Sequence, residues 1–137
     1  MNQLYRPILS ALLLLCAAGA SAGTVEVRVT GVSAKGSVAV AVCDKERFLK
    51  QCAYSGSAPA QVGETTVTVK GVPPGKWAVL AYQDENGNGE LDRNFIGMPK
   101  EPYGFSRDAR GKFGPPTFED AAIEVGETQA TANVQLR

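Results

Sequence analysis

The 137-residue sequence contains no histidine. This absence excludes Ser-His-Asp and Cys-His catalysis, zinc sites built on imidazole, and the side chain that most often acts as a general base near neutral pH. The sequence also lacks an excess of charge of either sign, because it has 14 basic and 14 acidic residues. No field of one sign is therefore available to gather a polyanion, and we do not expect nucleic-acid binding.

Only one long apolar run is present, at the start of the chain. Residues 8–20 are almost entirely apolar, Arg6 precedes them, and a stretch of small residues ends at Ala22. The run is shorter than the roughly 20 residues that span a bilayer, which disfavours an uncleaved anchor. We expect residues 1–22 to be a signal peptide and residues 23–137 to be one periplasmic or secreted domain that does not span the membrane.

Cysteines are few, and the three present have different expected roles. Cys16 lies in the expected signal peptide after Leu15, where a lipoprotein signal has a small residue, so we do not expect lipidation. Cys43 and Cys52 are an even pair in a chain bound for an oxidising compartment, which predicts a structural disulfide. A redox-active or metal-binding pair is the alternative, but redox thiols are usually two residues apart and zinc needs more ligands.

Hydrophobic periodicity predicts strands separated by turns. The turn residues Pro73, Pro74 and Gly75 precede one of these strands, in which we expect Trp77 to be a core residue. The expected strands cover residues 24–30, 36–43, 64–72, 76–84, 121–125 and 130–136.

The remaining segments are expected to connect these strands. Asp44 is a candidate N-cap for one or two helical turns over residues 44–50. Residues 55–59 are expected to be loop, residues 85–120 a long loop, and residues 126–128 a hairpin connection. The expected fold is all-β: an antiparallel β-sandwich of Greek-key, transthyretin-like or immunoglobulin-like type, with one short helix and a long loop.

An oxygen-rich motif begins the long loop. Asp84, Asn86, Asn88 and Asp92 occupy positions 1, 3, 5 and 9 of a pattern with glycine at position 6, as in calcium loops of the EF-hand or dockerin type. Alternate residues of a tightly turning chain point to a common centre, where the backbone carbonyl of Glu90 at position 7 also binds. Oxygen donors favour Ca²⁺ over a transition metal. We therefore predict a structural calcium site formed by these five residues.

The motif departs from an EF-hand at position 12, where Phe95 stands in place of the bidentate glutamate. Glu101, Glu119 and Asp120 are candidates for the missing ligand. The alternative interpretation is that the asparagines and glycines only form turns in a polar loop.

Aromatic residues later in the long loop have two interpretations. Tyr103 and Phe105 are candidates for an exposed platform that binds a sugar ring or a peptide. The alternative is that Phe95, Ile96, Phe105 and Phe118 fold back as plugs over the open end of the sandwich.

Several segments together resemble a known family. Residues 72–79, 84–92, 96–101, 103–106 and 115–118 are similar to the bacterial domain-of-unknown-function 2141 family. The resemblance implies an exported single-domain protein and no particular activity. The proline-glycine turn before an aromatic-bearing strand is also similar to transthyretin-like and carboxypeptidase-regulatory-like sandwiches, which implies an accessory or binding role by analogy of fold only.

We therefore expect a non-enzymatic binding or accessory module with a calcium-stabilised loop, whose partner is a carbohydrate or a protein of the cell envelope. The first alternative is an envelope structural or interaction protein that pairs through an exposed edge strand and has no ion site. The second is a hydrolase that uses a pair of carboxylates from the long loop.

Overall fold

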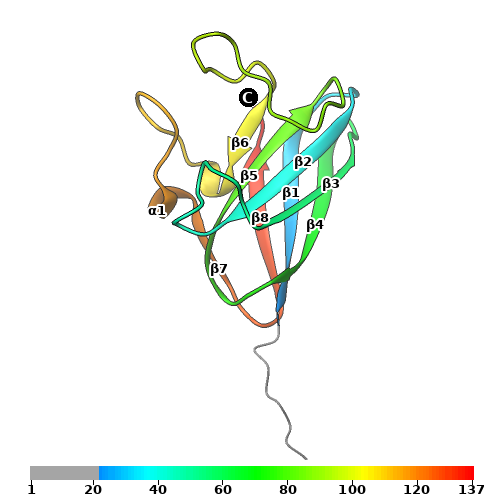
Figure 1. Ribbon diagram of the computed structural model, residues 1–137. Coiled ribbons are helices and arrows are strands. Elements are labelled where there is room, and N and C mark those ends of the chain that lie inside the picture. Colours follow the sequence, from blue (N-terminus) through cyan, green and yellow to red (C-terminus); the bar gives the residue numbers. More distant parts are fainter. Residues whose placement is uncertain (1–21) are drawn as a thin grey trace, which may run out of the picture.

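The computed structural model describes residues 22–137 and shows two β-sheets packed face to face (Figure 1). The expected signal peptide lies outside the described residues except for Ala22, so it stays a prediction. The elements in chain order are β1 (Gly23–Val32), β2 (Ser37–Cys43), β3 (Tyr54–Pro59), β4 (Gly63–Val72), β5 (Gly75–Asp84), β6 (Tyr103–Phe105), the 3₁₀ helix η1 (Ser106–Asp108), α1 (Phe118–Ala121), β7 (Ala122–Val125) and β8 (Gln129–Gln135).

The two sheets differ in size. One has three strands in the order β4-β1-β8, and the other has five, in the order β3-β2-β5-β6 with β7 also paired to β5. All pairs are antiparallel except β1 and β8, which run parallel. The prediction of an all-β sandwich is confirmed, and β2 is a central strand as expected.

Valine forms most of the core between the sheets. In β1, Val25, Val27 and Val29 are fully buried and alternate with more exposed polar residues. Valines of β2 and β4 face them in the same alternation. β-Branched side chains pack well on a pleated surface, and their period of two is what the sequence pattern indicates.

The connection over residues 126–128 is not a hairpin, contrary to the prediction. β7 pairs with β5 in one sheet, whereas β8 pairs with β1 in the other. Val125 and Val134 are therefore buried from opposite sides of the same core. Alternation alone shows that each strand has a buried face, but it does not show that the two strands belong to different sheets.

The helix expected over residues 44–50 is also wrong, because these residues form turns. Asp44 does cap the first turn, since its Oδ1 accepts a hydrogen bond of 2.9 Å from the Arg47 backbone N–H. The disulfide between Cys43 and Cys52 is present as predicted and brings their Cα atoms to 4.7 Å. A chain that must return to its starting point within nine residues cannot continue along a helix axis.

Two strands were not expected from the sequence. Residues 55–59, predicted as loop, belong to β3, which pairs with β2 along its length. β6 pairs with Leu80–Tyr82 of β5 and also exchanges backbone hydrogen bonds with the C-terminal residue: the Tyr103 N–H donates to Arg137 O at 3.3 Å and the Arg137 N–H donates to Tyr103 O at 3.1 Å. These bonds connect the two sheets on this side of the sandwich.

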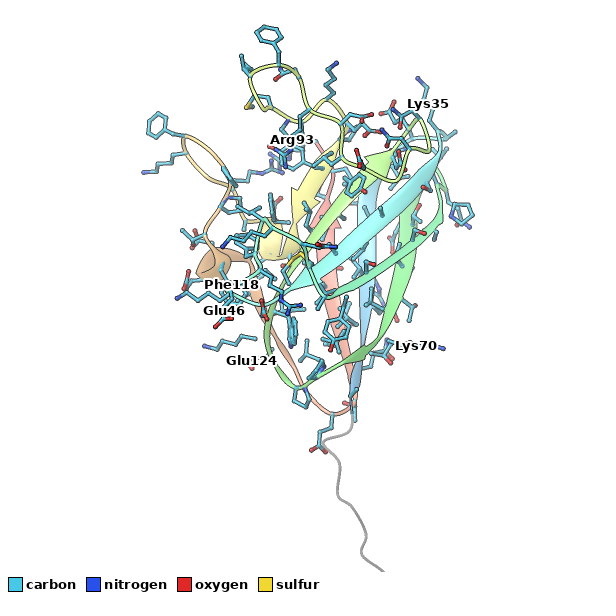
Figure 2. The ribbon with its side chains drawn as sticks, viewed as in Figure 1. Lys35, Glu46, Lys70, Arg93, Phe118 and Glu124 are labelled. Carbon is cyan, nitrogen blue, oxygen red and sulfur yellow. A yellow bond between two sulfur atoms is a disulfide. The ribbon has the colours of Figure 1, made fainter. Side chains whose placement is uncertain are left out.

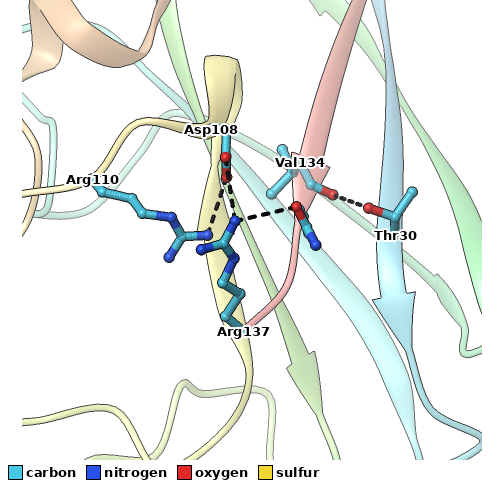
Figure 3. Close-up of polar contacts among 6 residues, drawn as sticks. Thr30, Asp108, Arg110, Val134 and Arg137 are labelled. Atoms are coloured by element: carbon cyan, nitrogen blue, oxygen red, sulfur yellow. Dashed lines mark hydrogen bonds and ion pairs between the residues drawn. The ribbon is translucent and has the colours of Figure 1, made fainter.

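The backbones of β6 and β8 approach each other closely beside this connection. A Cβ at Gly104 would lie 2.2 Å from the backbone oxygen of Gln135, so only glycine fits there. Nearby, Asp108 of η1 pairs with Arg110 at 3.1 Å and with Arg137 at 3.5 Å (Figure 3). The C-terminal residues are thus held against β6 and η1 by both backbone and side-chain contacts.

Trp77 lies at the rim of the core rather than in its centre. It is half-buried, its ring meets that of Tyr54 edge-on at 5.4 Å, and its Nε1 donates a 2.8 Å hydrogen bond to Pro73 O. Its expected place in the core is therefore confirmed only in part. Between residues 22 and 137, no helix is long and apolar enough to cross a membrane.

Candidate functional site

The oxygen-rich motif begins at the last residue of β5, so the sheet fixes its first position. Asp84 is 4% exposed and pairs with Ser37 of β2. Its Oδ1 accepts a 3.2 Å hydrogen bond from Asn88 N–H, and its Oδ2 accepts one of 2.8 Å from Gly89 N–H. Gly89 has a φ of +77°, a left-handed conformation that glycine adopts without strain. The carboxylate therefore closes a tight turn at positions 1, 5 and 6 of the motif.

The two asparagines continue this turn with side-chain to backbone hydrogen bonds. Asn86 Oδ1 accepts from Asn88 N–H at 3.2 Å, and Asn88 Oδ1 accepts from Glu90 N–H at 3.0 Å. Both side-chain amides donate to the Asp92 carboxylate, each at 2.5 Å. All five sequence-predicted positions therefore lie in one compact loop.

Glu101 is brought to this loop from a distant position in the sequence. It is 8% exposed, and its carboxylate accepts hydrogen bonds from Glu85 N–H at 2.6 Å and from Asp92 N–H at 3.0 Å. Of the three candidates for the missing ligand, it alone contacts the motif.

The other two candidates lie in or beside α1. The Glu119 carboxylate is 2.5 Å from Lys45 Nζ. The hydrogen bond from Lys45, followed by one from the backbone, lowers the pKa of Glu119 below its ordinary value. Asp120 donates its backbone N–H to Thr117 Oγ1 at 3.2 Å as part of the helix cap. Neither carboxylate contributes to the motif.

The carboxylates of this loop affect the pKa of Tyr82, which lies beside them in β5. Its hydroxyl donates a 3.2 Å hydrogen bond to Gly89 O. Burial raises the pKa of its phenol, and the carboxylates raise it further, in the order Asp84, Glu101, Glu90 and Asp92. Among the ion pairs formed by residues 22–137, none involves any of these four carboxylates.

The carboxylates do not surround a common point in this conformation. Over residues 22–137, no group of three or more Asp, Glu or Cys side chains is arranged to hold a metal ion. The amide oxygens of Asn86 and Asn88, which belong to the predicted donor set together with the Glu90 backbone carbonyl, both already accept backbone hydrogen bonds. The geometry is that of a loop closed by hydrogen bonds, with its oxygens gathered on one turn.

The expected aromatic platform is not exposed as a pair. Tyr103 is half-buried, but Phe105 is only 5% exposed and packs edge-on against Phe48 and Tyr103, with ring centroids 5.9 and 6.1 Å apart. Phe105 therefore belongs to a small second core, and only a small part of its ring reaches the hollow described below.

The alternative interpretation of these aromatics as plugs is correct for two residues and wrong for two. Phe105 and Phe118 are buried in the second core. Phe95 and Ile96 are exposed instead, and their loop stands away from the sheets (Figure 1). A regular core pattern is absent around them, so the sequence did not indicate which way they face.

A hollow of about 760 Å³ was not expected from the sequence. It lies between the loop over residues 93–99 and the loop over residues 111–115, with Leu80 and Tyr103 of the sheet among its lining residues. Phenylalanine beside basic and turn residues in both loops is the only sequence signal that could have indicated it.

The comparisons with known proteins give one finding. No curated protein and no solved structure matches the chain. A family model described as "Uncharacterized protein conserved in bacteria (DUF2141)" matches residues 27–133, which run from within β1 to within β8 and include the whole motif. The chain therefore belongs to the DUF2141 family of bacterial proteins.

Proposed function

We propose that this protein is an exported, non-enzymatic binding or accessory module whose loop over residues 84–92 binds one structural Ca²⁺. One observation supports the calcium site most directly. Asp84 and Glu101 are almost fully buried, share a loop with Asp92, and form no ion pair within residues 22–137. Buried charges without a counter-charge are unfavourable, and a divalent cation supplies that charge.

The donor set fits a hard cation. Each carboxylate oxygen of Asp84, and each of Glu101, accepts one backbone hydrogen bond, which leaves a second lone pair for a metal. Asp92 adds a third carboxylate, and the amide oxygens add neutral donors. This chemistry, oxygen only and rich in carboxylate, suits Ca²⁺.

Glu101 takes the place that position 12 leaves open. It lies nine positions after Asp92 and reaches back to that residue's backbone. A small rearrangement of the Asp92 and asparagine side chains would turn their oxygens inward while the backbone bonds of Asp84 and Glu101 persist. The ion would then hold the long loop in one conformation, so that binding of an envelope carbohydrate or protein costs less ordering entropy.

Thermal unfolding in chelator, in calcium and in magnesium tests the ion site. At a Ca²⁺ concentration about 100 times Kd, linkage predicts about 2.7 kcal/mol of stabilisation, on the order of ten degrees in Tm for a domain of this size. Asp92→Asn removes a charge but keeps the side-chain shape, and we expect it to abolish most of this shift. Glu90→Gln is the matched control, because only the backbone carbonyl of Glu90 is assigned to the ion.

Three outcomes would contradict the proposal: no calcium-dependent shift in the wild type, an equal shift in magnesium, or an undiminished shift in Asp92→Asn. Asp84→Asn provides a second variant if Asp92→Asn does not fold.

A further inference from the structure

Two loops on this molecule expose large apolar side chains at their tips. We name them the Phe95 loop (residues 93–100) and the Phe113 loop (residues 109–116). Both phenylalanines are fully exposed, and Ile96 and Met98 are also exposed in the first loop. Figure 1 shows both loops standing away from the sheets, above β6 and beside α1. Exposure of such large apolar side chains to water is unfavourable, so we expect the two tips to contact a partner.

The charge of the two loops is of one sign. The Phe95 loop carries Arg93 and Lys100, the Phe113 loop carries Arg110 and Lys112, and all four are exposed. Neither loop contains an acidic residue, and within residues 22–137 the only ion pair made by these four cations links Arg110 to Asp108, outside the loop. Figure 2 places Arg93 between the loops, where it lines the hollow together with Lys112. The two loops themselves therefore complement an anionic partner, while the acidic residues Asp92, Glu101 and Asp108 directly flank them in the sequence.

Four backbone N–H groups of the Phe95 loop donate to acceptors within the loop. Asn94 N–H donates to Met98 O at 2.8 Å, and Gly97 N–H donates to Asn94 O at 3.0 Å. Asn94 Oδ1 accepts from Ile96 N–H at 3.1 Å and from Met98 N–H at 3.0 Å. A tip whose N–H groups are paired in this way can leave water at little cost, which entry into lipid demands.

We propose that the Phe95 and Phe113 loops dock the protein on an anionic lipid bilayer. The apolar tips enter the boundary between headgroups and acyl chains, while the four cations contact lipid phosphates. A bilayer is preferred to a protein partner because it meets two separate tips at once and requires no shape that fits the hollow between them. This inference goes beyond the calcium site and does not depend on it.

Tryptophan fluorescence reports loop insertion directly. Phe95→Trp and Phe113→Trp each place an indole at a tip, and Val62→Trp is the matched control, because Val62 is an exposed apolar residue between β3 and β4. Trp77 is present in every variant and gives a constant background. On vesicles of phosphatidylcholine and phosphatidylglycerol, we expect a blue shift and quenching by brominated lipid for the two tip variants and neither effect for Val62→Trp.

Vesicle partitioning of the full chain tests the energetic contributions. Each Phe→Ser substitution at a tip is expected to weaken partitioning about tenfold or more, since burial of the ring is lost. Lys100→Gln/Lys112→Gln is expected to weaken it about fivefold per charge, an effect that disappears on pure phosphatidylcholine. Lys35→Gln/Lys70→Gln removes the same charge from outside the loops, as Figure 2 shows, and leaves partitioning within about twofold.

The result that would overturn the proposal is equally specific. No blue shift at either tip, or equal shifts at Val62, means that the loops do not enter the bilayer, even if the chain sediments with vesicles through residues 1–21. Capture of a soluble anionic amphiphile in the hollow without tip insertion also overturns it, in favour of a ligand pocket. The vesicle assays are run both in calcium and in chelator. Calcium binding itself is measured by the shift in Tm, so a failure of the calcium site is distinguished from a failure of membrane docking.

Discussion

The Oε1 atom of Glu101 lies 3.0 Å from the backbone nitrogen of Asp92. The other oxygen of the same carboxylate accepts the backbone N–H of Glu85 at 2.6 Å. One buried side chain therefore fastens the start and the end of the oxygen-rich motif. A separate backbone bond closes the base of the Phe95 loop at the same residue, because Lys100 N–H donates to Asp92 O at 2.7 Å. A long segment with little regular structure is ordered here by polar contacts rather than by packing.

Glu101→Gln should destabilise the protein even without metal. A glutamine offers one acceptor oxygen, so its amide nitrogen faces a backbone N–H that then lacks a partner. We expect a loss of about 1–3 kcal/mol in the free energy of unfolding, measured by denaturant titration in chelator. Glu46→Gln, at an exposed position, should change it by less than about 0.5 kcal/mol. Equal stability of the two variants would show that the loop does not need this carboxylate.

The parts of the fold that the sequence predicts are those in which side chains alternate. Val25, Val27 and Val29 indicate a half-buried strand because the side-chain period of a strand is two, and the sandwich follows from several such strands. β3 could not be predicted because its small side chains give only a weak alternation. Its conformation depends on backbone hydrogen bonds to β2, which the sequence does not show. The burial of Gln83 could not be predicted either. Its side-chain amide forms hydrogen bonds with the backbone of Ser33 and Lys35, which are distant in the sequence.

The candidate site is predictable to a similar extent. The spacing from Asp84 to Asp92 is local, so it indicates that these five residues share one loop, whereas their role as calcium ligands stays a prediction. Glu101 could be named only as one of three candidates, since the sequence does not show which distant carboxylate folds back. The exposure of Phe95 could not be predicted, because aromatic residues in an irregular loop are equally compatible with a buried plug.

Ser106→Ala should reveal a second polar clamp, between β5 and α1. The Ser106 hydroxyl is fully buried, accepts Val79 N–H at 3.0 Å and donates to Ala121 O at 2.5 Å. Its removal leaves two buried backbone groups without partners, and we expect a loss of about 1–3 kcal/mol. Ser57→Ala, on the exposed face of β3, is the control for denaturant unfolding. A loss below about 0.5 kcal/mol in Ser106→Ala would mean that water replaces the hydroxyl.

Reduction of the disulfide should destabilise the protein without changing the sheet order. The bond between Cys43 and Cys52 closes a short loop, for which chain entropy predicts about 2.7 kcal/mol. The double variant Cys43→Ser/Cys52→Ser should show a similar loss in denaturant unfolding and should no longer respond to reductant. An unchanged midpoint on reduction of the wild type would contradict this, whereas the double variant controls for effects of the reductant elsewhere.

Tyr82→Phe should remove a loss of stability at alkaline pH. The folded protein raises the pKa of this phenol above its ordinary value of 10.0, so the folded state keeps a proton that the unfolded chain releases. The associated stability is fully present below pH 10 and is lost as the pH rises through the folded pKa. The difference between the tyrosinate absorbance titrations of wild type and Tyr82→Phe isolates the group, and denaturant unfolding against pH measures the linkage.

Calcium binding should shift the titration of Tyr82 in a defined direction. Because Asp84 and Glu101 follow burial as the largest causes of the raised pKa, a cation bound to them should shift the Tyr82 pKa down toward its ordinary value. The alkaline loss of stability that belongs to Tyr82 should then be smaller in calcium than in chelator. A Tyr82 titration that is the same in both conditions, or that moves upward in calcium, would mean that the ion does not bind beside these carboxylates.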